Sequence, residues 1–93
     1  MKFRHALGEV IRETRHELGL NLREVAQRGT LALGYLSEVE RGHKEVSSEL
    51  LDCIALGLDV PLSKLIEKTA IRIRMSEPID VSDFQLDLAE LVH

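Results

Sequence analysis

Apolar residues and one threonine recur near the start of this chain at the spacing of one helix face, at Leu7, Val10, Ile11, Thr14 and Leu18. This spacing predicts an amphipathic helix over about residues 3–18. Gly19 follows directly and is a typical C-terminal stop, because glycine adopts the left-handed conformation that ends many helices. The chain therefore begins with one long helix whose inner face is aliphatic.

A second, shorter helix is predicted over residues 22–29. Asn21 is a suitable N-cap, because its side-chain oxygen can accept a backbone N–H of the first turn. Glu24 stands three residues later, in the position of a capping box. Gly29 marks the end of this helix.

A tight turn over residues 30–32 leads into a third helix, predicted over residues 33–41 and ended by Gly42. Leu36 and Val39 form its inward stripe. Two short helices joined by such a turn are the geometry that places the second helix in the major groove of DNA. The pattern therefore predicts double-stranded DNA as a partner.

Two more helices complete the predicted domain. Ser47 or Ser48 caps the fourth helix, whose buried face is expected to contain Leu50, Leu51, Ile54, Ala55 and Leu58. The fifth helix begins after Pro61, which is tolerated in a first turn, and extends to about Lys68. Its expected inward residues are Leu62, Leu65 and Ile66.

Beyond Lys68 the pattern changes, because apolar and polar residues alternate from Thr69 to Met75. A short strand, an extended linker and a continuation of the fifth helix all fit this segment. Residues 76–78 interrupt the helical pattern. Asp80 or Ser82 caps a last predicted helix that extends to about Val92. We therefore expect an all-α fold, with a helix-turn-helix domain over residues 1–68 and a helical arm over residues 69–93.

Composition fits one small globular domain, with 93 residues, 44% of them hydrophobic and 30% charged. The net charge of −4 is unusual for a DNA-binding protein. However, residues 1–48 contain eight Lys or Arg and seven Asp or Glu, a net charge of +1, whereas residues 49–93 contain four and nine, a net charge of −5. The acidity therefore belongs to the half that is not expected to contact DNA.

Other features narrow the functional class. The single cysteine, Cys53, cannot form an internal disulfide, and no apolar run approaches the roughly 18 residues of a membrane span. We expect a cytoplasmic protein. The four histidines show no metal-ligand spacing with Cys53, and neither a nucleophile–base pair nor a glycine-rich phosphate loop is present. The sequence therefore predicts neither an enzyme nor a bound metal or cofactor.

Several motifs together resemble the Xre, or Cro/cI-type, family of helix-turn-helix regulators. They are Leu18-Gly19-Leu20-Asn21-Leu22, Val25-Ala26, Leu36-Ser37-Glu38-Val39-Glu40-Arg41-Gly42, Ile54-Ala55 and Val60-Pro61-Leu62. The resemblance covers about residues 6–67 and implies the five-helix phage-repressor fold. Two positions depart from the family pattern. Thr30 stands where the turn usually has glycine, and Ala32 replaces a Ser or Thr cap, which costs the third helix about 1 kcal/mol.

A narrower similarity links the chain to the actinobacterial Clp-gene regulators. Its motifs are Leu22-Arg23-Glu24-Val25, Gly34 to Gly42, Lys44-Glu45 and Ser47-Ser48-Glu49-Leu50-Leu51. That family comprises small transcription factors, chiefly activators of Clp protease genes. The resemblance therefore implies activation, for which RNA polymerase is a further expected contact through acidic surface such as Glu24.

The family resemblance implies which residues contact bases. The positions that match are Leu33, Gly34, Ser37 and Glu38. Part of the specificity is expected from Arg23 at the start of the second helix or from DNA shape. Leu33 can pack against a thymine methyl group and Glu38 can accept from a cytosine amino group. For Glu38, a merely solvated helix face is an equally weighted alternative.

Phosphate contacts are expected on both sides of these residues. At the start of the second helix, Asn21, Leu22 and Arg23 offer free backbone N–H groups at a positive dipole end. Tyr35, Arg41, His43 and Lys44 are the expected side-chain contacts. A place in the core is the alternative for Tyr35, and a merely solvated side chain is the alternative for the other three. The resemblance also implies a buried ion pair between Arg15 and Glu40, with a structural role.

A homodimer follows from the small size of the domain, since two half-sites are needed for tight specific binding. The apolar residues in excess of what the domain needs are Ile71, Ile73, Met75, Phe84, Leu88 and Leu91. We expect them to form the dimer contact, the alternative being a sixth helix that folds back on its own core. An antitoxin or anti-repressor of the same fold, directed at another protein, is the alternative function.

Overall fold

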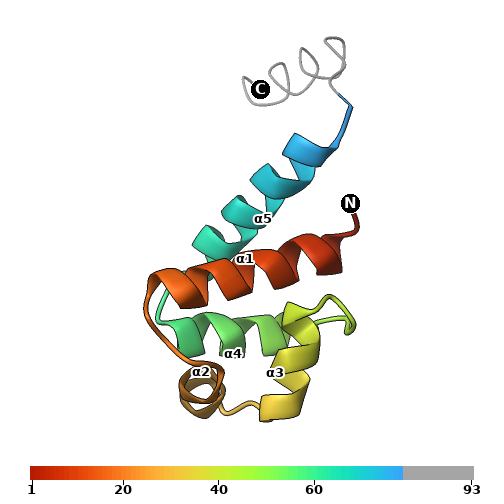
Figure 1. Ribbon diagram of the computed structural model, residues 1–93. Coiled ribbons are helices and arrows are strands. Elements are labelled where there is room, and N and C mark those ends of the chain that lie inside the picture. Colours follow the sequence, from red (N-terminus) through yellow and green to blue (C-terminus); the bar gives the residue numbers. More distant parts are fainter. Residues whose placement is uncertain (79–93) are drawn as a thin grey trace.

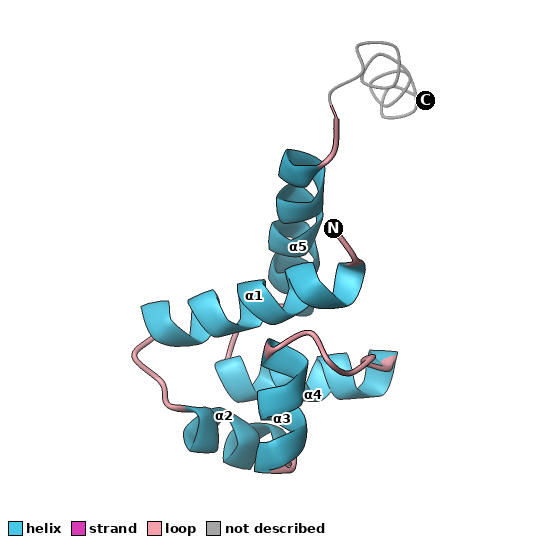
Figure 2. Cartoon of the chain, turned by 45° about the vertical axis from the view of Figure 1, so that its right-hand side comes forward, coloured by secondary structure: helices cyan, strands magenta, loops and turns pink. Residues whose placement is uncertain are grey.

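The computed structural model describes residues 1–78, in which five α-helices and no strand are found (Figures 1 and 2). The helices are α1 (Phe3–Glu17), α2 (Leu22–Gly29), α3 (Leu33–Glu40), α4 (Ser48–Leu58) and α5 (Leu62–Ser76). The predicted all-α class and the five helices are confirmed. The predicted last helix, with Phe84, Leu88 and Leu91, lies outside the described residues. None of the described helices is long and apolar enough to cross a membrane.

The core is aliphatic and draws on all five helices. It contains Leu7, Val10, Ile11, Val25, Ala26, Leu36, Val39, Leu51, Ile54, Ala55, Leu58 and Leu65. Leu50, predicted in the buried face of α4, is only half-buried. The prediction for Leu18 is wrong, because this side chain is 48% exposed. α1 ends at Glu17, one residue earlier than predicted, so Leu18 is the C-cap residue after the helix, and Gly19 at φ +69° then turns the chain away from the helix axis.

The crossing of α2 and α4 brings the two helix backbones together at Gly29 and Gly57. A Cβ atom at Gly29 would lie 2.4 Å from the carbonyl oxygen of Cys53, and one at Gly57 would lie 2.4 Å from that of Val25. Both positions therefore require glycine for close backbone packing. The left-handed position of the turn falls on Thr30, at φ 57° and ψ 47°, where a β-branched residue costs roughly 1–2 kcal/mol.

Helix α5 is longer than predicted, because the alternating segment after Lys68 continues it to Ser76. Its buried positions are Leu65 and Thr69, and the Thr69 hydroxyl donates to the Leu65 carbonyl at 2.7 Å. The prediction that Leu62 and Ile66 face inward is wrong, since both are exposed. The helix is rotated so that the side of Thr69 meets α1.

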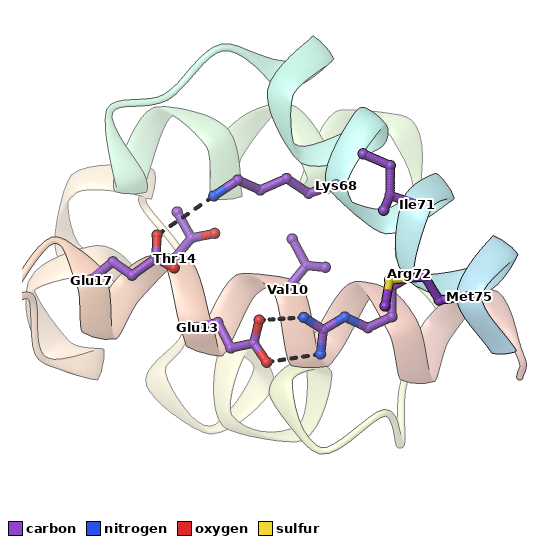
Figure 3. Close-up of a pocket in the computed structure, with 8 residues that line it drawn as sticks. All are labelled: Val10, Glu13, Thr14, Glu17, Lys68, Ile71, Arg72 and Met75. Carbon is purple, nitrogen blue, oxygen red and sulfur yellow. Dashed lines mark hydrogen bonds and ion pairs between the residues drawn. The ribbon is translucent and has the colours of Figure 1, made fainter.

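Charged side chains join α5 to α1 (Figure 3). Arg72 Nη1 donates to Glu9 Oε2 at 3.0 Å and to Glu13 Oε1 at 2.8 Å, and its Nη2 also pairs with Glu13. Lys68 Nζ lies 3.6 Å from Glu17 Oε2. These pairs flank a shallow groove of about 240 Å³ with Val10, Ile71 and Met75 among its lining residues. The groove leaves α5 with an apolar edge that no described segment covers.

Candidate nucleic-acid interface

Helices α2 and α3 lie side by side at one end of the molecule, and α5 lies across α1 at the other (Figure 2). Val25 and Ala26 of α2 and Leu36 and Val39 of α3 are buried in the core. These four residues fix both helices and leave their opposite sides exposed. The pair therefore forms a surface well separated from the α1–α5 groove.

The N-terminus of α2 is closed by the predicted capping box. The Glu24 N–H donates to Asn21 Oδ1 at 2.8 Å, and the Asn21 N–H donates to Glu24 Oε1 at 3.0 Å. The Asn21 N–H that was predicted to bind phosphate is thus used within the helix in this structure. The N–H groups of Leu22 and Arg23 belong to the first turn, where no intrahelical acceptor exists, and they remain suited to an anion.

The structure brings the predicted base-contacting residues of α3 onto one surface. Leu33 and Gly34 are exposed in the first turn of the helix, and Ser37 and Glu38 are half-buried one turn later. A Cβ atom at Gly34 would meet nothing within 4 Å, so the backbone here is open to close approach. Arg23 is exposed on neighbouring α2. Ala32 makes no side-chain cap, as predicted for this position.

Glu38 makes two contacts that were not predicted. Its Oε1 accepts from Arg41 Nη1 at 3.0 Å, and its Oε2 lies 2.9 Å from His43 Nδ1. The hydrogen bond from His43, with the charge of Arg41 nearby, holds the pKa of Glu38 below its ordinary value. Two of the predicted phosphate contacts are therefore held by one carboxylate. The i, i+3 spacing of Glu38 and Arg41 is the sequence signal from which this pair could have been predicted.

Tyr35 lies at the edge of the core, which was the alternative position for this residue. It packs half-buried against the core, its hydroxyl donates to the Glu45 carbonyl at 3.1 Å, and burial raises the pKa of this hydroxyl. The Glu45 carboxylate accepts from Arg4 Nη1 at 2.6 Å. Tyr35 and Arg4 thus fasten the loop that presents His43 and Lys44, both of which are exposed. No local pattern linked Arg4 to this loop.

The predicted ion pair between Arg15 and Glu40 is present and bidentate. Arg15 Nε donates to Glu40 Oε2 at 2.7 Å and Nη2 donates to Oε1 at 3.0 Å, which raises the pKa of Arg15. Arg15 Nη1 also donates to the Leu20 carbonyl at 3.1 Å. The pair joins α1, the loop before α2 and the end of α3. In the described part of the chain, no three His, Cys, Asp or Glu side chains form a metal-binding cluster.

The chain is similar to known proteins in both sequence and structure. The helix-turn-helix family HTH_3 matches residues 11–65, which include both α2 and α3. Transcriptional regulator ClgR of Mycobacterium tuberculosis is 45% identical over 74 residues, which are 80% of this chain and 66% of that protein. The matched part is therefore slightly less than two thirds of this relative.

Two solved structures are similar over most of their own length. The clp gene regulator ClgR of Corynebacterium glutamicum has a TM-score of 0.71 and 41% sequence identity, over 75% of this chain and 91% of that chain. The restriction-modification controller protein C.AhdI of Aeromonas hydrophila has a TM-score of 0.64 and 31% identity, over 67% of this chain and 94% of that chain.

Proposed function

This chain belongs to the HTH_3 family of Xre-type helix-turn-helix transcription regulators, which are not enzymes, and we propose that it binds a pseudo-palindromic DNA site as a homodimer. We further propose that it activates Clp protease genes. The regulators from Mycobacterium and Corynebacterium, at 45% and 41% identity, support this assignment.

The observation that carries the proposal is the placement of α2 and α3. The core holds Leu36 and Val39, so that Leu33, Gly34 and Ser37 stand on the accessible side of α3. In our proposal α3 enters the major groove, where these residues and Glu38 contact base edges. Arg23 contacts bases from the start of α2.

Phosphates are bound on both sides of α3 in this proposal. The first-turn N–H groups of Leu22 and Arg23 approach one phosphate along the α2 dipole. Arg41, His43 and Lys44 approach the backbone on the other side. Tyr35 acts on this second contact by fixing the loop, because its hydroxyl already donates to the Glu45 carbonyl.

The dimer would form through the arm that begins inside α5. This helix runs through residue 68 without interruption, and Ile71 and Met75 are exposed on it. A single domain of this size buries too little surface for tight specific binding, whereas two copies can bind two half-sites. For activation, contact with RNA polymerase would use acidic surface beside α2. The Glu24 carboxylate there has the additional structural role of capping the helix.

The proposal is tested by selecting a DNA site from a random pool and measuring fluorescence anisotropy on this site and on a scrambled duplex, at two salt concentrations. We expect site-selective binding that weakens as salt increases, since phosphate contacts release counterions. Arg41→Ala/Lys44→Ala removes two proposed phosphate contacts and should lower the affinity for the selected site by at least about tenfold.

The matched control is Lys2→Ala/Lys64→Ala, which removes the same charge from exposed positions outside α2 and α3. We expect the control to bind almost as the natural chain does. If no site is selected and neither variant differs from the natural chain, the DNA-binding proposal is wrong. A protein partner, as in an antitoxin or anti-repressor, is then the function to test.

A further inference from the structure

We infer that Glu38 is a positioning residue that holds Arg41 and His43 away from DNA until the bound sequence offers its carboxylate another partner. The inference rests on the proposed function, because it assigns a task to one residue of the proposed interface. It differs from base contact alone in that Glu38 controls the phosphate contacts of its neighbours. The sequence preference of the protein would then arise partly from phosphate contacts that Arg41 and His43 do not make on non-specific DNA.

The geometry places the side chains of Arg41 and His43 on one carboxylate. Arg41 Nη1 lies 3.0 Å from Oε1 and His43 Nδ1 lies 2.9 Å from Oε2, so each oxygen has a donor. A carboxylate only accepts hydrogen bonds, which makes the imidazole nitrogen the donor in this contact. With both oxygens used, the two side chains closest to the end of α3 point back toward the helix.

These contacts are exposed and therefore exchangeable. The Arg41 and His43 side chains are 62% and 59% exposed, whereas Glu38 is 35% exposed. Exposed ion pairs contribute little to folding stability, because water and salt screen them. A phosphate or a base can therefore replace one partner without unfolding α3. The buried pair at Arg15 and Glu40 has the opposite character and serves the fold.

Two situations on DNA follow from this arrangement. On a non-specific sequence, no base donor replaces Arg41 or His43, and the negative Glu38 remains beside the phosphates. On a site with a cytosine within reach of α3, its amino group donates to one oxygen of Glu38, and the side chain bound to that oxygen is released. The released side chain, Arg41 or His43, then turns to the phosphate backbone, where a charge-assisted hydrogen bond strengthens binding. Glu38 thus makes the phosphate contacts depend on the base sequence.

The test compares Glu38→Gln with the natural chain by fluorescence anisotropy, on the selected and scrambled duplexes. The amide keeps the size of the side chain and removes its charge. We expect affinity for the scrambled duplex to increase about fivefold, because Arg41 and His43 become available to any phosphate. Affinity for the selected site should rise less or fall, so that the ratio of the two affinities decreases.

A second comparison separates this role from simple charge repulsion. In an Arg41→Gln/His43→Gln background, Glu38→Gln should no longer raise the affinity for scrambled DNA, since the side chains that it releases are absent. A gain of the same size in this background would overturn the inference, as would no gain in the natural background. Glu67→Gln on α5 is the control for a change of net charge and should leave both affinities unchanged.

The Arg41→Gln/His43→Gln protein gives an independent readout that does not depend on the folding of the Glu38 variant. It should lose at least about tenfold in affinity for the selected site and no more than about threefold for scrambled DNA. Equal losses on the two duplexes would overturn the inference. If the natural chain shows no preference for any site, the proposed function itself is wrong, which distinguishes the two failures.

Discussion

Arg15 and Glu40 illustrate how two residues far apart in the chain hold the helix-turn-helix in place. Their side chains are 12% and 8% exposed, and two hydrogen bonds join them. A third hydrogen bond from Arg15 reaches the Leu20 carbonyl. Both side chains are largely shielded from water, so removing the charge of one residue leaves the charge of the other buried and unpaired.

We predict that Arg15→Met or Glu40→Gln lowers the free energy of unfolding by about 3–5 kcal/mol, because each leaves one buried charge without its partner. Urea denaturation followed by circular dichroism measures the change. The double variant Arg15→Met/Glu40→Leu is the control and should recover most of the loss. A loss below about 1 kcal/mol in both single variants would show that the pair is effectively solvated.

At the scale of helices, the contact between α1 and α5 depends on an arginine that bridges two carboxylates. Arg72 pairs with Glu9 and Glu13, and its hydrogen bond lowers the pKa of Glu13 from the ordinary value of 4.5. The unfolded chain therefore binds more protons than the folded chain just below this pH. The stabilisation is complete above pH 4.5 and is lost as the pH falls through the lowered pKa of folded Glu13.

We therefore expect Arg72→Gln to reduce the thermal midpoint at neutral pH, and the difference from the natural chain to shrink as the pH falls below 4.5. Thermal melts followed by circular dichroism between about pH 3 and pH 7 measure this. Lys64→Gln removes a cation from an exposed position of the same helix and is the control. A difference that stays constant over this range would mean that Arg72 stabilises the contact by packing alone.

At the scale of the whole molecule, the exposed apolar edge of α5 is the feature that a dimer would explain. Ile71 is 51% exposed and Met75 is 82% exposed, and both line the groove against α1 (Figure 3). Neither residue supports the core of its own domain. A second copy that covers them would remove apolar surface from water and place two α3 helices for two half-sites.

Ile71→Glu/Met75→Glu should therefore shift the protein from dimer to monomer in sedimentation velocity experiments, because it places charge in the proposed contact. The helix content should stay unchanged, since both side chains are exposed. Leu56→Glu on α4 is the matched control, as its side chain is also exposed. A natural chain that sediments as a monomer at all concentrations would contradict the homodimer.

Much of this architecture follows from local sequence. Asn21 with Glu24, and Ser47, fix the starts of α2 and α4 through hydrogen bonds that span three residues. Gly19 and Gly42 mark two ends through their positive φ angles. The inner faces of α1 and α3 follow from a repeat of 3.6 residues. The sequence alone therefore determined the five helices, their order and the two that form the candidate DNA-binding surface.

Other features depend on neighbours that no local pattern describes. Alternation after Lys68 could not identify a helix, because continued packing on α1 decides its conformation and buries Thr69 instead of Ile66. Likewise, Tyr35 reaches Glu45, and Arg4 reaches the same residue from α1. A long polar side chain can reach several possible partners, and the folded backbone determines which of these partners lie within hydrogen-bond distance. Helix periodicity is a local property and the sequence determines it, whereas partner choice is decided by the tertiary structure.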